Sequence, residues 1–304
     1  MNKKAFEMSF AWIFAIIAGI SILFLAIYGT TQAIKTRNYE IDTQTSDKLA
    51  ILLNPLETSM EFSKSSIVRF GEVTKIFNDK CYTYGNFGQQ SIGISSGEKE
   101  QSYGKPQYNK YIFSQNLEQG KEFIVFSKPF FMPFKVADSI FFSGRSYCFV
   151  KSPEDIKDEL LSLGVNNAYF TDIKENCSEE SEKVCFNEKC DISVYSDEYF
   201  NEGYVIKNEK KLYYSGSLIY GAIFSSPDIY KCNVKRLMMR LASLCILYKD
   251  ETRILAKRNC YSPLDSQLDE LASLAKNFNE DLSLINEKAE EINGINDASD
   301  CRIF

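Results

Sequence analysis

Residues 8–28 read MSFAWIFAIIAGISILFLAIY, a run of 21 residues without a charged side chain. At the helical rise of about 1.5 Å per residue the run spans roughly 30 Å, which is the thickness of the hydrocarbon core of a bilayer. Trp12 and Tyr28 lie near its ends, where aromatic side chains anchor helices at the membrane interface. The alternative is a cleaved secretory signal, but such signals have shorter apolar cores and a small-x-small cleavage site, which Thr31-Gln32-Ala33 matches poorly. The run therefore predicts a transmembrane helix that stays on the protein.

The cysteines indicate which side of the membrane holds the rest of the chain. Lys3 and Lys4 precede the span and Lys35 and Arg37 follow it, so the distribution of positive charge is almost balanced. All nine cysteines follow the span, and this density is typical of an oxidising compartment. We therefore expect a cytoplasmic amino terminus within a segment 1–28 that forms the tip and anchor, with residues 29–304 outside.

The composition excludes several classes of function. The 304 residues include 35 Lys and Arg, 41 Asp and Glu and no His, which gives a net charge of −6. Without His there is no Ser-His-Asp triad and no His-ligated metal site. Net negative charge argues against nucleic acid as a partner, because phosphates require a basic face. We expect no cofactor, no metal and no catalytic residues, although Ser96 and Ser102 each have a lysine three residues later.

The residues before the membrane segment carry a further signal. The sequence Lys3-Lys4-Ala5-Phe6-Glu7-Met8-Ser9 followed by an apolar helix resembles the class III signal of type IV pilin-like proteins. The resemblance covers only this amino-terminal part. It implies that a peptidase cuts on the cytoplasmic side after Lys4 and Ala5, so that Phe6 becomes the first residue and the helix stays on the mature protein. A plain, uncleaved signal anchor is the alternative.

A stalk and a β-rich domain are predicted after the span. Residues 29–55 are polar with spaced apolar residues and end at Pro55, which predicts a helical stalk. Residues 56–224 hold short runs rich in Ile, Val, Phe and Tyr between turn residues. The glycine-rich stretch 82–110 predicts a long surface loop, and residues 152–164 predict one helix. Strands are expected over 66–77, 111–115, 122–126, 135–142, 147–150 and 168–173.

Two Asn-Glu pairs in this domain, Asn187-Glu188 and Asn208-Glu209, predict two-residue hairpin turns. The first turn would set Cys185 opposite Cys190, close enough for a disulfide. A zinc site is the competing interpretation of the cysteines near 177–190. It is disfavoured because the chain has neither a Cys-x-x-Cys spacing nor a His.

The last part of the chain, residues 225–304, predicts an antiparallel helical hairpin. Ser226-Pro227 and Ser262-Pro263 are helix starts, and in the second helix apolar residues recur at alternating spacings of four and three from Leu264 to Ile292. Two such helices joined by a short link pack antiparallel. Their exposed surface could serve an interaction, or the helices could pack only on each other. The apolar positions of the second helix are Leu264, Leu268, Leu271, Ala275, Phe278, Leu282, Ile285, Ala289 and Ile292.

A disulfide between Cys232 and Cys301 would close this hairpin. With the turn at Tyr261, equal distances along the two helices set Cys232 near Ala289, and Asn293-Gly294 is expected to end the second helix. The following residues could then fold back and bring Cys301 to Cys232.

The fold class expected from the sequence is α+β: a transmembrane helix and helical stalk, a disulfide-braced β-rich domain and a helical hairpin. The leading hypothesis is a non-enzymatic, single-pass surface protein with a structural, adhesive or assembly role. Its partners would be the lipid bilayer and further copies of itself or other envelope proteins. The alternatives are a pilin-like subunit that polymerises through its amino-terminal helix, and an extracytoplasmic enzyme or ligand-binding module.

Overall fold

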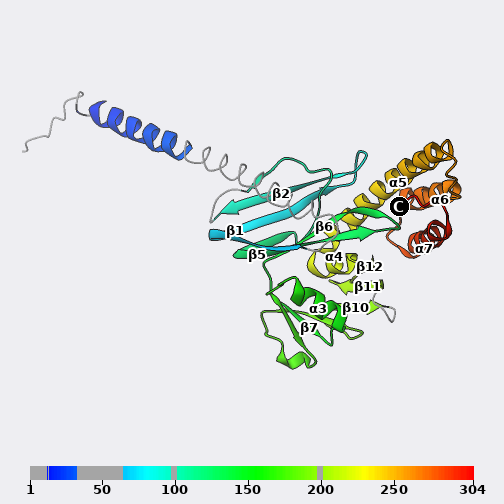
Figure 1. Ribbon diagram of the computed structural model, residues 1–304. Helices are drawn as coiled ribbons and strands as arrows, with labels where there is room; N and C mark the ends of the chain where they lie inside the picture. The colour runs from blue at the N-terminus through cyan, green and yellow to red at the C-terminus, as the bar shows by residue number, and fades with distance from the viewer. Residues whose placement is uncertain (1–11, 13, 33–63, 97–100, 197–200) are drawn as a thin grey trace, which may run out of the picture.

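The computed structural model of this chain describes residues 12, 14–32, 64–96, 101–196 and 201–304. Within these residues it is an α+β protein with one apolar amino-terminal helix, Phe14–Gln32 (Figure 1). The stalk predicted over 29–55 and the processing residues Lys4, Ala5 and Phe6 lie outside the described residues, apart from the first four stalk positions, which continue this helix.

Six strands form the first sheet, sheet A, in the order β3-β2-β1-β5-β6-β4. All neighbours are antiparallel except β4 and β6, which run parallel. The sheet curls until β2 approaches the segment before β4, where Gln90 and Gln107 form an isolated β-bridge. The strands are β1 Lys64–Tyr82, β2 Gln89–Ser96, β3 Ser102–Tyr103, β4 Tyr111–Phe113, β5 Leu117–Phe131 and β6 Lys135–Ser143.

The second sheet, sheet B, has the order β12-β11-β10-β9-β7-β8. Strands β8, β7, β9 and β10 are parallel neighbours, whereas β10, β11 and β12 are antiparallel. Helix α3 (Glu154–Ser162) connects β7 to β8, as parallel pairing requires. The strands are β7 Tyr147–Val150, β8 Ala168–Thr171, β9 Glu182–Phe186, β10 Ile192–Ser196, β11 Glu202–Lys207 and β12 Lys210–Ser215, with a short 3-10 helix η1 over Lys174–Asn176.

Both faces of sheet A are buried, because successive side chains of a strand point to opposite faces. On β5, Phe123 and Val125 join the smaller core inside the curled sheet, whereas Ile124 and Phe126 join the larger core. The larger core is continuous with sheet B and with helices α4 (Leu218–Phe224) and α5 (Pro227–Ala256). The β-rich part and the carboxyl-terminal helices therefore share one core.

The six predicted strands are confirmed, but the loop predicted over 82–110 is wrong in part, since it contains β2 and β3. Glycine and serine hide the alternation of Ile92 and Ile94, which are both buried. Gly93 between them is required by packing, because a Cβ there would lie 2.9 Å from the ring of Tyr103 on β3.

One of the two predicted hairpins is wrong. The Asn208-Glu209 turn joins antiparallel β11 and β12, and both turn residues have positive φ, as a tight hairpin turn requires. At Asn187-Glu188 there is no hairpin, because β9 and β10 pair parallel. The chain between them instead turns back within a short loop and then enters β10 in the direction of β9.

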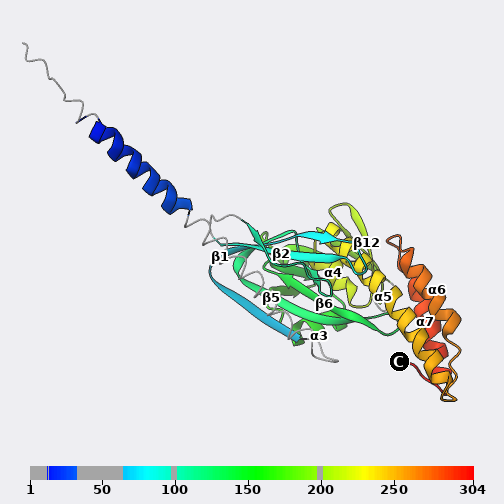
Figure 2. The same cartoon turned by 90° about the horizontal axis from the view of Figure 1, so that it is seen from above.

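The prediction that the second part of the hairpin is a single long helix is also wrong. It is divided into α6 (Asp265–Lys276) and α7 (Ser283–Ala298). Asp281 accepts hydrogen bonds from the backbone N–H and the hydroxyl of Ser283 at 2.9 and 2.6 Å, which starts a new helix. The apolar face that the spacing predicted is nevertheless buried on both sides of the break, and α5, α6 and α7 gather at one end of the molecule (Figure 2).

Candidate functional site

Eight of the nine cysteines form four disulfides, and Cys245 is an unpaired thiol in the core. The pairs are Cys81–Cys232, Cys148–Cys177, Cys185–Cys190 and Cys260–Cys301, with Cα–Cα distances of 6.2, 5.7, 5.6 and 5.4 Å. Cys185 and Cys190 are thus joined as the sequence predicted, although across a loop between parallel strands rather than a hairpin turn.

The predicted Cys232–Cys301 bond is wrong. The prediction assumed one unbroken second helix, after which the last residues of the chain would fold back to Cys232. Because the helix breaks after Lys276, α7 reverses direction again, and the end of the chain returns to the turn after α5. There Cys301 forms a disulfide with Cys260. Cys232 forms its disulfide with Cys81 at the end of β1 instead.

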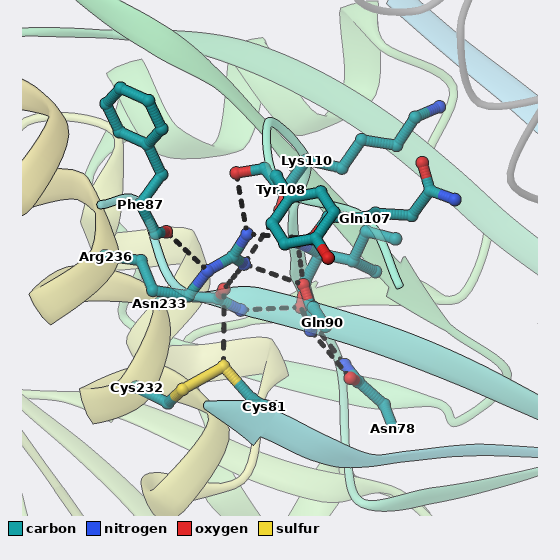
Figure 3. The surroundings of a disulfide bond; sticks show 11 residues. Asn78, Cys81, Phe87, Gln90, Gln107, Tyr108, Lys110, Cys232, Asn233 and Arg236 are labelled. Carbon is teal, nitrogen blue, oxygen red and sulfur yellow. Dashed lines mark hydrogen bonds between the residues drawn. A yellow bond between two sulfur atoms is a disulfide. The ribbon is translucent and has the colours of Figure 1, made fainter. Parts of the chain in front are cut away.

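Beside the Cys81–Cys232 bond, Arg236 of α5 is fully buried, and no carboxylate of the described residues pairs with it. Its guanidinium donates to the carbonyl oxygens of Phe87, Gln107, Tyr108 and Lys110 at 2.8–3.3 Å (Figure 3). It also donates to the side-chain oxygens of Gln90 and Asn233 at 3.3 and 2.8 Å, and its Cζ lies 4.8 Å from the centre of the Tyr111 ring.

This arrangement fixes the two loops at one end of sheet A to helix α5. Burial lowers the pKa of Arg236 to about 10, so the group stays charged at neutral pH and is stabilised by oriented carbonyl dipoles. Gly88 lets the turn between β1 and β2 approach, since a Cβ there would meet the Tyr82 carbonyl oxygen and lie 2.8 Å from Cγ of Arg236. Its φ of +62° is also unfavourable for other residues.

The two loops held by Arg236 expose four aromatic side chains, which we call the aromatic tip: Tyr82, Tyr84, Phe87 and Tyr108. Tyr84 is 61% and Tyr108 57% exposed, and the rings of Tyr82 and Tyr84 lie 5.3 Å apart. Exposed tyrosines beside Gly and Asn residues in a fixed loop are typical of protein-binding loops, because they offer a large contact area at a low entropic cost. The tip is therefore an exposed aromatic surface that Arg236 fixes to helix α5.

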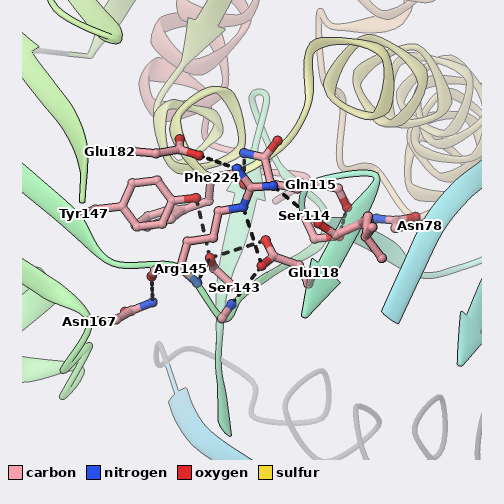
Figure 4. Close-up of polar contacts among 12 residues, drawn as sticks. Asn78, Ser114, Gln115, Glu118, Ser143, Arg145, Tyr147, Asn167, Glu182 and Phe224 are labelled. Carbon is pink, nitrogen blue, oxygen red and sulfur yellow. Dashed lines mark hydrogen bonds and ion pairs between the residues drawn. The ribbon is translucent and has the colours of Figure 1, made fainter. Parts of the chain in front are cut away.

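A second cluster joins the two sheets. Glu118 of β5 is almost completely buried and accepts hydrogen bonds from the Gly144 N–H at 3.1 Å and the Ser143 hydroxyl at 3.4 Å (Figure 4). Arg145 lies 3.9 Å from Glu118 and 2.5 Å from Glu182 of β9, and Lys207 of β11 lies 3.7 Å from Glu182.

Burial sets the ionisation of this cluster. Desolvation raises the pKa of Glu118 to about 7, against the opposing influence of the Gly144 N–H and Arg145. Desolvation also lowers the pKa of Lys207 to about 8. Perturbed pKa values can mark catalytic groups, but here each carboxylate oxygen and the Lys207 ammonium are held by neighbours within the protein, and Lys207 donates to the Ile223 carbonyl at 2.6 Å. The contacts of the cluster therefore link sheet A to sheet B, which is a structural role.

The pKa of Glu118 predicts a pH dependence of stability. Because the folded protein raises this pKa from 4.5 to about 7, the contribution of Glu118 to stability is fully present below pH 4.5 and is lost as pH rises through 7. The loss reaches about 3 kcal/mol at pH 7. The contribution of Lys207 has the opposite sign: it is present above pH 10.5 and lost as pH falls through 8. Glu118→Gln is therefore expected to flatten the decline in melting temperature between pH 5 and 7, by roughly 5–10 °C.

Calorimetric melting of the full chain across this pH range tests the prediction. Glu122→Gln is the matched control, because Glu122 lies on the same strand but is exposed and pairs with Arg69 at the surface. An unchanged slope in Glu118→Gln would show that another group titrates in this range.

Sequence reasoning missed Arg236, Glu118 and Lys207. Charged residues beside apolar ones in a helix or strand usually extend to solvent, so burial is not visible in composition. The available signals were positional: Arg236 follows Cys232 by four residues and shares its helix face, and Lys207 follows the buried Val205 by two on β11.

Among the described residues, no group of three or more Cys, Asp or Glu side chains is placed to hold a metal ion. A scan against protein-family models and searches of curated proteins and of solved structures give no match to this chain.

Proposed function

We propose that this chain is a single-pass membrane protein whose disulfide-linked head lies outside the cytoplasm and acts by binding, in an adhesive or assembly role. The observation that carries the proposal is the amino-terminal helix. The large apolar side chains that the structure describes there, Trp12 and those from Phe14 to Tyr28, are exposed, with exposed fractions of 45–68%. Such a continuous apolar surface is unfavourable in water and favourable in lipid.

The four disulfides support an extracytoplasmic head. Disulfides form and persist in oxidising compartments and are rare in the cytosol. Two of them, Cys148–Cys177 and Cys185–Cys190, brace the edge of sheet B that carries β7, β8 and β9. The other two fasten helix α5 to β1 and the end of the chain to the turn after α5.

The aromatic tip supports a binding role. Cys81–Cys232 and Arg236 hold the tip in place, so that little conformational entropy is lost when it contacts a partner. Tyrosine-rich, preorganised surfaces of this kind are enriched at protein interfaces.

A pilin-like subunit is the second candidate, because the same exposed helix could pack against helices of other copies as well as against lipid. A mature amino terminus at Phe6, determined by mass spectrometry of the protein recovered from membranes, would favour this candidate over a plain anchor.

Protease accessibility tests the topology. In intact cells, an epitope tag placed after Phe304 is expected to be removed by added protease, because residues 29–304 face outward. A tag placed before Met1 is the matched control and should stay protected until the membrane is ruptured. Protection of the tag after Phe304 in intact cells would contradict the proposal.

A further inference from the structure

The second half of helix α5 carries large apolar side chains on the side that faces away from the core. Ile246 is 45%, Leu247 61% and Ile254 55% exposed. A surface helix normally presents polar residues on this side, and clustered exposed aliphatic side chains are typical of an interaction surface. With other exposed residues at helical spacing they form what we call the outer face of α5: Ser243, Ile246, Leu247, Asp250, Ile254 and Lys257.

Positive charge borders the outer face of α5. Residues 246–258 contain four Lys and Arg against two Asp and Glu, although the whole chain has a net charge of −6. Lys257 and Arg258 are exposed, and neither has an ion-pair partner among the described residues. Asp250 on this face is paired with Arg253 at 3.3 Å. A partner that fits this face therefore offers both apolar contacts and carboxylates.

Helix α7 of the same chain has such a surface. Its residues 283–298 contain four Asp and Glu, and its single base, Lys288, is buried. Glu287 and Glu290 are exposed and have no ion-pair partner within the part of the chain that the structure describes. Leu284 is 65% exposed and adds an apolar side chain. Spacings of three and four positions define the exposed face of α7: Leu284, Glu287, Glu291, Gly294 and Ala298.

Gly294 on the exposed face of α7 is an observation independent of charge. A Cβ at this position would meet no atom within 4 Å, so no contact within the described residues requires glycine there. Glycine inside an exposed helix destabilises the helix relative to alanine. It does allow a second helix to approach closely, because the distance between packed helices depends on the side chains at the contact. Gly294 therefore points to a helix that packs on α7.

The contact between α5 and α6 provides a precedent within one copy. Arg253 of α5 lies 3.5 Å from Asp265 of α6, and Lys249 of α5 pairs with Asp269. Helix α5 thus already binds one acidic helix through basic residues beside an apolar core. The outer face of α5 offers the same combination of residues on another side of the helix.

We propose that the outer face of α5 in one copy of this chain binds the exposed face of α7 in a second copy. The aliphatic side chains of α5 pack on Leu284 and over Gly294. Lys257 and Arg258 pair with the carboxylates of α7. The two faces share no residue, so each copy binds one neighbour through α5 and another through α7, which is a heterologous contact. The inference goes beyond the proposed function and does not depend on the aromatic tip or on membrane anchoring.

Sedimentation velocity of the full-length chain in non-ionic detergent tests the proposal. We expect reversible association that increases with protein concentration and weakens as NaCl screens the charges. The double variant Leu247→Gln, Ile254→Gln should weaken association at least about tenfold, because it removes apolar contact area. The matched control is Leu161→Gln, Ile173→Gln, whose side chains are 56% and 55% exposed outside α5 and α7, and it should leave association unchanged.

A mixture of two variants tests the heterologous arrangement. The double variant Leu284→Gln, Glu287→Lys disables the exposed face of α7 and should associate as weakly as the glutamine variant of α5. The two variants mixed together should nevertheless form a complex of one copy of each and nothing larger. One variant retains an intact α5 face and the other an intact α7 face, so a single contact remains possible. A folding defect cannot produce this result.

Gly294→Leu separates association from stability. Leucine has the higher helix propensity and the space around Gly294 is open, so the melting temperature of the single copy should rise. The leucine side chain keeps a second helix away from α7, and association should therefore weaken at least about tenfold. Association as strong as that of the wild type would contradict a close contact at Gly294.

Three further results would overturn the proposal. If the chain stays monomeric at every concentration, the outer face of α5 is covered by residues 33–63 of the same copy or by another protein. If association persists unchanged in both face variants, the amino-terminal helix is responsible for it. If the two variants form no complex when mixed, α5 and α7 do not contact each other between copies.

Discussion

Replacement of Arg236 by methionine is expected to destabilise the folded head by about 3–5 kcal/mol, because six oxygen acceptors, three of them in buried and three in partly buried hydrogen bonds, lose the donor that they share. These acceptors are the carbonyl oxygens of Phe87, Gln107, Tyr108 and Lys110 and the side-chain oxygens of Gln90 and Asn233. Methionine fills much of the volume but offers no hydrogen bond. The expected fall in melting temperature is roughly 10 °C.

The loss of stability should affect the whole head but should be greatest in the two loops that Arg236 holds. Hydrogen exchange should accelerate first in residues 84–90 and 105–112, whose carbonyl groups Arg236 holds, and less in sheet B. Arg236→Lys is expected to recover only part of the stability, since an ammonium has three donors and cannot span both loops as the planar guanidinium does. Lys235→Met, at an exposed neighbouring position on α5, is the control and should leave stability within about 0.5 kcal/mol. A lysine variant as stable as the wild type would show that the charge, and not the geometry, holds the loops.

Loss of the Cys81–Cys232 disulfide is expected to destabilise the head by about 5 kcal/mol in the chain-entropy model. The two cysteines are 151 residues apart, so the bond removes a large conformational freedom from the unfolded chain. It also fastens the end of β1 to α5 next to Arg236. The double variant Cys81→Ala, Cys232→Ala should therefore unfold at a markedly lower denaturant concentration under oxidising conditions.

The Cys185–Cys190 pair provides the comparison. Its cysteines are only 5 residues apart, so the same model predicts a loss of about 2 kcal/mol for the corresponding double alanine variant. Denaturant titration of both variants, with the other disulfides intact, measures the difference. Equal losses would mean that local contacts at each bond, rather than the length of the closed loop, determine its contribution.

Several elements could be predicted because the signals that define them are local. The six strands that lie in β1 and in β4 to β8 show runs of β-branched and aromatic residues, and Ser152-Pro153 marks the start of α3. The Asn208-Glu209 hairpin followed from turn chemistry alone. Strand β2 could not be recognised, since its glycine and glutamine residues are placed there by Tyr103 and by the amide contacts around Ile112, which come from distant parts of the chain.

The disulfide pairings likewise divide into those that nearby residues determine and those that the tertiary structure determines. Cys185 and Cys190 are only 5 residues apart, so their pairing could be predicted although the hairpin turn from which it was inferred is absent. The partner of Cys232 depends on where β1 ends relative to α5, and the partner of Cys301 depends on the break between α6 and α7. The heptad spacing predicted which residues face the core across that break. It did not predict the break itself, because burial requires only the correct face and not a continuous helix.

By itself, the sequence determined the apolar amino-terminal helix, the α+β composition, the buried face of the carboxyl-terminal helices and the exclusion of His-dependent chemistry. These properties follow from the order and kind of neighbouring residues. The tertiary structure alone decided that Arg236 is buried among carbonyl oxygens and that Glu118 and Lys207 join the two sheets. Each of these sites draws on segments far apart in the chain, and the ionisation and hydrogen bonding of a side chain depend on what surrounds it in space.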